Sequence, residues 1–276
     1  MSRDNSTNFL YLSRFLPKRH KRFYVKFVKA LEENGIKYGL LPGTKDIWCR
    51  DYMPIQTAKN RFIQFNYAPS YLKGYKHLIT DTKKVCKAIG VKPILSDIIL
   101  DGGNAVASND KVIFTSRIFN DNPVHSKDEL MGELKGLLKV REVIILPEDP
   151  DDIFGHADGM VRFINEHTVL VNDYEKESKA FKSKFYSAIR KAGLKMVHLP
   201  YNPYRNAKKL DATGCYINYL QVGRMIFVPS FGMIEDNKAI KALKKAFKGY
   251  KLVQIPSKQL AKRGGVLNCV SWDIIK

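Results

Sequence analysis

The sequence has few cysteines, no long hydrophobic run and a shortage of acidic side chains. Its 276 residues include four cysteines, and no two of them have the short spacing of a zinc knuckle. A chain of this length also needs no disulfide framework. No apolar stretch approaches the roughly 18 residues of a membrane-spanning helix. Residues 1–20 lack the apolar core and the cleavage site of a secretory signal. We therefore predict no structural zinc, no membrane span and a cytoplasmic location.

Basic residues outnumber acidic ones by 47 to 27, which gives a formal net charge of +20. A basic surface attracts phosphates, so nucleic-acid binding must be considered. The lysines are nevertheless spread along the chain. The cluster at 238–248 has the spacing of the exposed side of an amphipathic helix. The charge therefore favours a lysine-rich solvated surface, and nucleic acid is not the expected partner.

A repeated order of predicted elements indicates the fold. Two short β-rich runs joined by a polar turn precede a helical stretch and a further short strand. The first run of each unit is expected at 52–57, 104–107, 159–164, 215–220 and 266–272. The last of these completes a unit with 9–12, 18–33 and 37–41 at the other end of the chain. Five ββαβ units predict an α/β fold, a five-bladed pseudo-symmetric propeller that closes as one domain over residues 1–276.

Each unit has an equivalent position where a loop enters its first strand. These positions follow at intervals of 53 to 58 residues and are Asp51, Asn104, Asp158, Tyr216 and Cys269. A closed ring brings one such loop from every unit to its axis, so residues far apart in the sequence are expected to meet there. The candidate site consists of the segments 46–51, 100–104, 154–158 and 263–269.

The residue types in these segments suit chemistry on a guanidinium group. His156 and Asp158 are two positions apart, so a strand would place both on one face, as in a general base beside a carboxylate or in a metal site. Two carboxylates can hold a planar, permanently charged guanidinium by paired hydrogen bonds. The thiolate of Cys269 could then attack its central carbon, while a histidine protonates the departing ammonia. The set favours a cysteine-dependent hydrolase.

The four segments resemble those of the agmatine deiminase and bacterial-type peptidylarginine deiminase family, within the guanidine-modifying superfamily. The family carries a Trp-x-Arg-Asp segment, an acidic-Gly-Gly-Asn segment, a Gly-His-x-Asp segment and a Gly-rich segment that ends in the catalytic cysteine. All four occur here in that order, at 48–51, 101–104, 155–158 and 264–269. The resemblance covers roughly residues 40–272. It implies the pentein fold, a five-bladed α/β propeller, in agreement with the repeat.

The resemblance also implies the catalytic roles. Cys269 would be the nucleophile, and His156 would be the general acid and base. Asp51 and Asp158 would grip the guanidinium, and Asp101 would orient the histidine. Enzymes of this family need no metal or organic cofactor.

Three further residues are expected to contact the substrate: Trp48, which would shape the pocket wall, Asn104 and Asn268. Asn268 stands where agmatine deiminases typically carry histidine, and Val266 stands where they carry asparagine. We expect the contacts to the far end of the substrate to come from loops such as 120–123 and 202–206.

The sequence leaves several functions open. Agmatine is the leading substrate, and its hydrolysis would give N-carbamoylputrescine and ammonia through a covalent thiouronium intermediate. Peptidylarginine and free arginine are alternatives, because the net charge of +20 would repel a small dication outside the reach of local carboxylates. An amidinotransferase, a non-catalytic basic binding propeller and a metal hydrolase that uses His156 and Asp158 are the remaining hypotheses. No pattern in the sequence predicts an oligomeric state.

Overall fold

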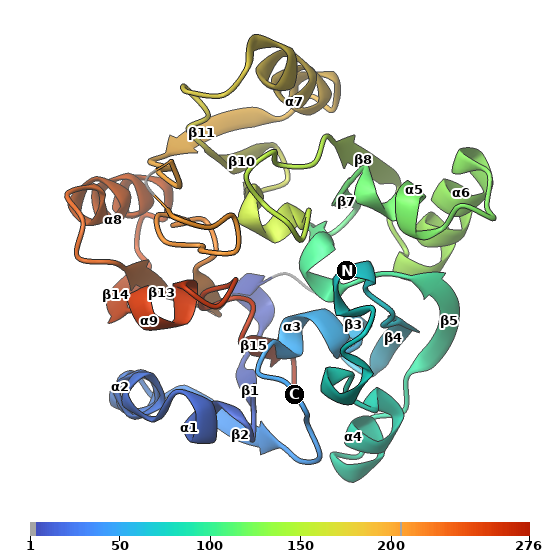
Figure 1. Cartoon of the computed structure of the whole chain (residues 1–276), viewed down its shortest axis with the longest axis horizontal. Coiled ribbons are helices and arrows are strands. Elements are labelled where there is room, and N and C mark those ends of the chain that lie inside the picture. Colours follow the sequence, from blue (N-terminus) through green and yellow to red (C-terminus); the bar gives the residue numbers. More distant parts are fainter. Residues whose placement is uncertain (1–3, 205) are drawn as a thin grey trace.

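Five small sheets stand around a common axis in the computed structural model, which describes residues 4–204 and 206–276 (Figure 1). In each sheet the first strand is antiparallel to the second, and the third is parallel to the second. The helices α2, α4, α6, α7 and α8 lie at the periphery of the ring. These are the five ββαβ blades that the repeat predicted. The predicted domain spans residues 1–276, of which 1–3 and 205 lie outside the described residues.

The strands are short and are named in chain order. They are β1 (Phe9–Ser13), β2 (Lys37–Leu41), β3 (Ile55–Ala58), β4 (Arg61–Asn66), β5 (Ile94–Ile99), β6 (Val106–Ala107), β7 (Lys111–Thr115), β8 (Glu142–Leu146), β9 (Val161–Asn165), β10 (Thr168–Asn172), β11 (Lys195–Leu199), β12 (Leu220–Val222), β13 (Met225–Ser230), β14 (Lys251–Pro256) and β15 (Ser271–Ile274).

The helices include long ones between blade strands and short ones near the axis. The α-helices are α1 (Leu16–Arg19), α2 (Lys21–Glu33), α3 (Cys49–Tyr52), α4 (Thr82–Ala88), α5 (Arg117–Asp121), α6 (Lys127–Leu138), α7 (Lys179–Lys191), α8 (Glu235–Ala246) and α9 (Lys258–Ala261). The 3₁₀ helices are η1 (Asp4–Ser6), η2 (Ser70–Leu72), η3 (Lys76–Leu78), η4 (Gly102–Asn104) and η5 (Ala157–Gly159).

One blade is built from both ends of the described chain. β15 pairs antiparallel with β1, with Ile274 opposite Phe9, and β1 pairs in parallel with β2. The prediction that the two ends together supply the fifth unit is therefore confirmed. This pairing closes the ring and holds the loop before β15, which carries Cys269, at the axis.

Amphipathic helices join neighbouring blades. α2 buries Phe23, Phe27 and Leu31, which recur every four residues and so lie on one side of the helix. The helix contacts β14 of the next blade as well as β2 of its own. Phe27 meets Phe227 edge to face, with ring centroids 6.0 Å apart. Burial of one such side chain contributes about 2–3 kcal/mol. α7 likewise contacts β8, and α8 contacts β11.

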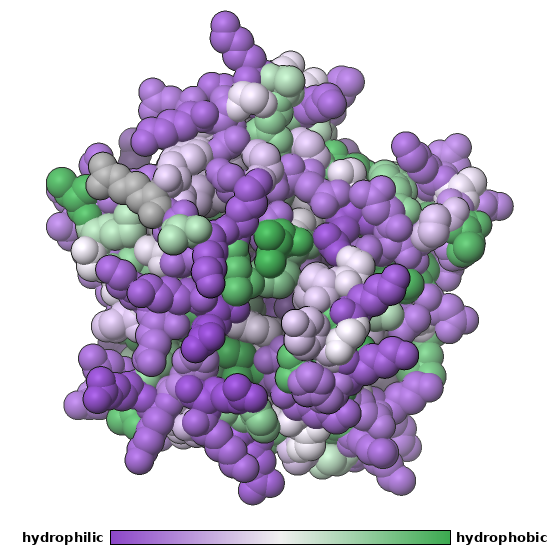
Figure 2. Space-filling view, viewed as in Figure 1, coloured by the Kyte–Doolittle hydropathy of each residue, from purple (hydrophilic) through white to green (hydrophobic). Residues whose placement is uncertain are grey.

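The outer surface has the composition that the charge predicted. Hydrophilic side chains cover most of the periphery in the space-filling view, and hydrophobic ones gather near its centre (Figure 2). Lys238, Lys241, Lys244, Lys245 and Lys248 are all exposed on or just after α8. The lysines at this rim are therefore solvated side chains of a helix whose other side is buried.

The inner strands begin later than predicted, because the chain makes a tight turn close to the axis. Asp51 lies in α3, Asn104 in η4 and Asp158 in η5, while residues 215–219 and 266–270 also precede their strands. Hydrogen bonds between residues three apart replace the sheet ladder there, as from Met160 N–H to the Ala157 carbonyl at 2.9 Å. The prediction that His156 and Asp158 share one face of a strand is wrong, since His156 caps η5 and Asp158 lies inside it.

Candidate active site

A thiol, an imidazole and three carboxylates meet at the axis of the ring. Cys269 Sγ lies 3.8 Å from Asp158 Oδ2. His156 Nε2 lies 3.0 Å from Asp101 Oδ2, and its Nδ1 lies 3.7 Å from Asp51 Oδ1. All five side chains are buried. The structure thus brings the five predicted catalytic residues into one cluster, although they come from four different blades.

The loop that carries Cys269 is fixed by neighbours on both sides. The amide oxygen of Asn218 accepts the backbone N–H of Cys269 and lies 3.4 Å from its Sγ. On the other side, the backbone N–H of Arg50 donates to the Cys269 carbonyl at 3.1 Å. Arg50 itself is held by a short ion pair with Asp273. These contacts determine where the thiol points and leave its sulfur beside Asp158.

Glycine at position 265 lets the wall of the site approach the thiol. A Cβ built there would lie 2.7 Å from Trp48 Cζ3, closer than real Cβ contacts, and 3.0 Å from Cys269 Sγ, tighter than most of them. Trp48 and the thiol therefore both pack close to this glycine. Trp48 is not among the described residues that line the cavity containing Cys269, and its place in the pocket wall and its contact with substrate stay predictions.

Asn268 and Asn104 have different surroundings. Asn268 Nδ2 donates to Asp158 Oδ2 at 2.6 Å, which holds the carboxylate beside Cys269. Asn104 Oδ1 accepts hydrogen bonds from both N–H and Oγ1 of Thr115 and from the N–H of Ala157. Asn104 thereby ties η4 to the segment that carries His156. Substrate contact by either amide stays a prediction.

Asp101 orients the imidazole together with a tyrosine. Asp101 Oδ2 accepts hydrogen bonds from His156 Nε2 and from the Tyr71 hydroxyl, the latter at 2.9 Å. The carboxylate favours a proton on Nε2, since a carboxylate can only accept. Asp152 fixes the backbone of the same loop by accepting the N–H groups of Phe154 and His156. The imidazole is therefore held through both its ring and its main chain.

The electrostatics of the cluster favour a charged imidazole and a neutral thiol. Burial alone would lower the pKa of His156, but the charge of Asp51, the hydrogen bond and charge of Asp101 and the charge of Asp158 raise it to about 10. Burial, with the charges of Asp158 and Asp51, raises the pKa of the Cys269 thiol well above its usual value. Burial also raises the pKa of Asp51 to about 8, against the opposing charge of His156. A bound cation would lower the pKa of the Cys269 thiol and the pKa of Asp51 again.

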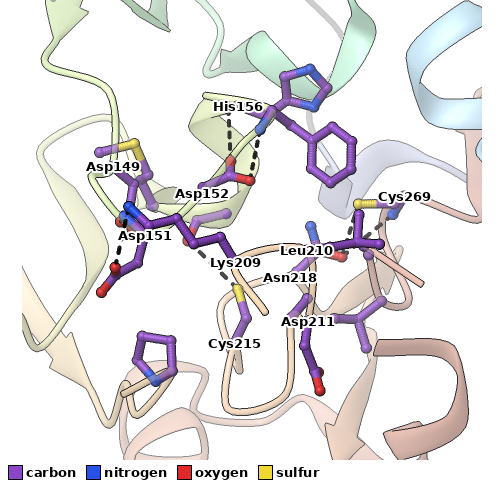
Figure 3. Close-up of a pocket in the computed structure, with 18 of the residues that line it drawn as sticks. Asp149, Asp151, Asp152, His156, Lys209, Leu210, Asp211, Cys215, Asn218 and Cys269 are labelled. Atoms are coloured by element: carbon purple, nitrogen blue, oxygen red, sulfur yellow. Dashed lines mark hydrogen bonds and ion pairs between the residues drawn. The ribbon is translucent and has the colours of Figure 1, made fainter. Parts of the chain in front are cut away.

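A narrow acidic cavity leads to the thiol. Figure 3 shows Cys269 and Asn218 on one side and Asp149, Asp151 and Asp152 on the other. The cavity has a volume of about 60 Å³, which is room for a few water molecules. Its lining contrasts in sign with the +20 charge of the whole chain.

The segment that covers this cavity is tied to the acidic wall. Lys209 Nζ lies 3.9 Å from Asp151 Oδ1 and donates to the Pro150 carbonyl at 2.6 Å. Leu210, Asp211 and Thr213 continue the lining from the same segment. The lysine neutralises only part of the acidic wall, so the cavity remains suited to a cation.

Sequence reasoning missed two polar residues of the cluster. Asn218 touches the thiol, whereas the predicted equivalent position, Tyr216, is buried and donates to Asp236. The repeat predicts Tyr216 as the equivalent position, two residues before Asn218. Tyr71 lies outside all four motifs, and no pattern in the sequence pointed to it.

The two loops predicted to reach the far end of the substrate differ in position. The segment 120–123 is not among the described residues that line the cavity, and Asn122 exchanges hydrogen bonds with the backbone of Ile99 in β5. Its contact with the far end of the substrate stays a prediction. In the segment 202–206, Pro203 lines the cavity, and residue 205 lies outside the described residues.

Residues 4–204 and 206–276 contain neither a metal-binding cluster nor a membrane-spanning helix. In this part of the chain no group of three His, Cys, Asp or Glu side chains is arranged to hold a metal ion. None of its helices combines the length and hydrophobicity needed to cross a lipid bilayer.

A ring of five ββαβ blades with a thiol, an imidazole and carboxylates at its axis defines a pentein, the fold of the guanidine-modifying enzymes. The chain belongs to the Porphyromonas-type peptidyl-arginine deiminase family, whose model matches residues 24–274.

Relatives and solved structures agree with this assignment. The agmatine deiminase of Medicago truncatula is 27% identical over 226 residues, which are 68% of this chain and 60% of that enzyme. The structure of the C. jejuni agmatine deiminase matches with a TM-score of 0.83 at 18% identity, over 100% of this chain and 95% of that one. The dimethylarginine dimethylaminohydrolase (DDAH) of Pseudomonas aeruginosa has a TM-score of 0.60 at 11% identity, over 97% of this chain and 99% of that one.

Proposed function

We propose that the chain is a cysteine-dependent deiminase that hydrolyses a guanidino group to a ureido group and ammonia. The observation that carries the proposal is the position of the Cys269 thiol, 3.8 Å from the carboxylate of Asp158 and at the inner end of an acidic cavity. A buried thiol beside a carboxylate suits a cationic electrophile, because the cation offsets the charge that keeps the thiol neutral.

Binding would neutralise the carboxylates. Asp51 and Asp158 both lie close to Gly103, whose added Cβ would lie 2.6 Å from Asp51 Oδ1 and 3.4 Å from Asp158 Oδ1. Each carboxylate can accept two N–H groups of one guanidinium and fix its plane. The bound charge then favours ionisation of both Asp51 and the thiol.

The covalent steps use Cys269 and His156 in turn. The thiolate attacks the guanidinium carbon and forms a C–S bond. His156, charged through Asp51 and Asp101, gives its proton to a nitrogen, and the C–N bond breaks to release ammonia. The resulting thiouronium adduct is attacked by a water whose proton passes to the now neutral His156. Collapse breaks the C–S bond and expels the thiolate, and the remaining hydroxyl proton passes to solvent, which leaves the neutral ureido product and the restored imidazolium.

Agmatine is the substrate that we favour, with N-carbamoylputrescine as product. The relatives named above are agmatine deiminases, and the C. jejuni enzyme has also been solved with substrate bound. The acidic wall formed by Asp149, Asp151 and Asp152 suits the second cation of such a molecule. Peptidylarginine and free arginine are the alternatives, and the cytoplasmic location stays a prediction.

The proposal is tested by ureido-product and ammonia assays on agmatine, free arginine and a peptide with an internal arginine. Turnover of at least one of the three, lost in Cys269→Ala, is expected. An amidinotransferase would instead need an added amine acceptor. If none of the three is hydrolysed and a cationic amidine reagent also fails to label Cys269, the proposal is wrong.

The pH dependence of kcat/KM is expected to be bell-shaped, with limbs near pH 8 and pH 10. Asp51 must lose its proton to bind a cation, so kcat/KM rises as the pH increases through about 8. His156 must keep its proton to release ammonia, so kcat/KM falls above about 10. Because kcat reports the bound enzyme, its lower limb should shift to lower pH. An optimum below pH 7 would contradict these assignments.

A matched pair of alkylating reagents should separate recognition of the cation from simple thiol reactivity. 2-Chloroacetamidine is a planar cation, and 2-chloroacetamide is its neutral counterpart. Two charge-assisted hydrogen bonds would make the amidine inactivate the enzyme about 100-fold faster at neutral pH. Agmatine should protect, and Asp158→Asn should reduce the difference. Equal rates for the two reagents would show that the carboxylates do not hold a cation beside Cys269.

A further inference from the structure

A second, wider hollow lies next to the reaction cavity. We call it the outer groove; its walls come from the segments 15–20, 45–48, 71–78, 153–154, 210 and 263. Phe154 and Leu210 line both hollows and form the partition between them. The outer groove offers about 510 Å³ to the centres of water-sized spheres, against about 60 Å³ for the cavity. A single small anion would leave most of it empty.

The outer groove is basic, whereas the cavity is acidic. Arg19, Lys45 and Arg263 line it and are exposed, and none of them forms an ion pair with a residue in the described part of the chain. The one carboxyl in its lining, Asp46, accepts the N–H of Ile47 at 2.6 Å. Three cationic side chains without an ion-pair partner among the described residues outnumber one carboxyl that already accepts a hydrogen bond. The groove is therefore positive, which suits an anionic occupant.

Aromatic side chains stand between these cations. Phe15, Trp48, Tyr71 and Tyr75 line the groove, and Tyr75 is 55% exposed. The Arg19 guanidinium lies over the Phe15 ring, 5.1 Å from its centroid. Rings and cations together suit a chain that carries both carboxylates and apolar groups, as a polypeptide does. The size of the groove also fits a segment of several residues.

The groove reaches the wall of the reacting centre. Trp48 lines it and packs against Gly265, the residue whose added Cβ would also meet Cys269 Sγ. A Cβ at the next glycine, Gly264, would lie 2.8 Å from the Phe154 ring of the partition. An occupant of the groove is therefore separated from the site of reaction by one layer of side chains.

We propose that the outer groove binds an acidic polypeptide segment, so that the substrates of this deiminase include arginine side chains flanked by aspartate or glutamate. The hydrolysis of such arginines rests on the proposed function, whereas the binding of an acidic segment in the outer groove does not. The guanidinium enters the acidic cavity while the flanking carboxylates pair with Arg19, Lys45 and Arg263. The groove is positive and matches the acidic flanks of such a peptide, whereas the cavity is negative and matches its arginine.

The test compares two triple variants that remove the same charge. Arg19→Gln, Lys45→Gln and Arg263→Gln change the groove, and Lys238→Gln, Lys241→Gln and Lys245→Gln change the rim helix α8 as the control. Peptides with one arginine and acidic, neutral or basic flanks are the substrates, with agmatine as a small reference. Three exposed ion pairs predict a loss of roughly tenfold in kcat/KM on the acidic peptide, mainly through KM. The groove variant should lose much less activity on agmatine than on the acidic peptide, and the rim variant should behave as wild type on both.

Binding is measured separately by fluorescence anisotropy on Cys269→Ala, with a labelled acidic peptide and a labelled single-stranded oligonucleotide. Peptide binding that is weakened by the groove variant and not by the rim variant supports the proposal, even if no guanidino compound is hydrolysed. Absence of acidic-peptide binding overturns it, as does equal weakening by both variants. Groove-dependent binding of the oligonucleotide without the peptide also overturns it and assigns the groove to nucleic acid.

Discussion

Replacing Cys269 with alanine is expected to abolish turnover and to leave substrate binding intact. The thiol supplies the bond that holds the intermediate, and its loss should lower kcat by at least about 10⁴-fold. The carboxylates that would bind the cation stay in place, because Asn268 and the backbone of Gly103 hold Asp158 and Asp51. Steady-state assays give kcat, and calorimetric titration with the substrate gives Kd, which should change less than about threefold.

The matched control for this change is Cys86→Ala. Cys86 is a buried free cysteine on α4, in a hydrophobic cluster that does not include Cys269. Its replacement removes one thiol from the core at a cost of about 1 kcal/mol, and activity should be retained. Turnover that survives in Cys269→Ala, or that is lost equally in Cys86→Ala, would show that Cys269 is not the nucleophile.

Replacing Gly103 with alanine is expected to inactivate the enzyme without unfolding it. An added Cβ would lie 2.6 Å from Asp51 Oδ1, 2.8 Å from His156 Nδ1 and 3.4 Å from Asp158 Oδ1. Every one of these atoms belongs to a proposed catalytic side chain, so any relaxation displaces the machinery. Asp51 Oδ1 must move by close to 1 Å to reach an ordinary contact distance of 3.4 Å or more, and a displacement of that size should lower kcat/KM by about 100-fold.

Gly136→Ala is the matched control for Gly103→Ala. Gly136 lies in α6, and nothing stands within 4 Å of a Cβ built there. Alanine should stabilise that helix by about 0.5–1 kcal/mol and leave catalysis unchanged. The measurements are kcat/KM and the midpoint of thermal unfolding. Near-normal activity in Gly103→Ala would mean that the cluster tolerates a methyl group at its centre, in conflict with the proposed arrangement.

The negative charge of the buried site explains how a basic protein can bind a cationic substrate. The chain carries a net charge of +20, but the exposed lysines of α8 lie at the rim, where salt screens them beyond about 8–10 Å. Asp51, Asp101 and Asp158 are buried at the axis, where His156 offsets part of their charge. The buried site is therefore negative and attracts a guanidinium, although the surface of the protein is positive.

The sequence predicted the ring because its repeat is regular. Each blade needs two short strands, a helix and a third strand, and the hydrophobic pattern changes period at the same place in every unit. The pairing of β15 with β1 followed from the half-units left at the two ends. The four motifs identified Asp51, Asp101, His156, Asp158 and Cys269 through their resemblance to the family. The ring explained why these residues meet, because a closed ring brings equivalent loops together.

What the sequence did not predict depends on turns and on distant packing. The approach to the axis is made by tight turns, so the period-two rule for strands failed at His156 and Asp158. The repeat also gave Tyr216 as the equivalent position, two residues before Asn218, so Asn218 was not predicted. Tyr71 reaches Asp101 from η2, and the outer groove collects side chains from six separate segments. Such contacts depend on the path of the loops, for which the sequence has no periodic signal.

The most direct test of the account is intact-protein mass spectrometry of the enzyme quenched during turnover. We expect an adduct with the mass of the substrate less ammonia, attached to Cys269 and absent from Cys269→Ala. It should disappear once the substrate is exhausted. Formation of ureido product with no such adduct, or with an adduct on another residue, would contradict the central claim that the Cys269 thiol attacks a guanidinium carbon.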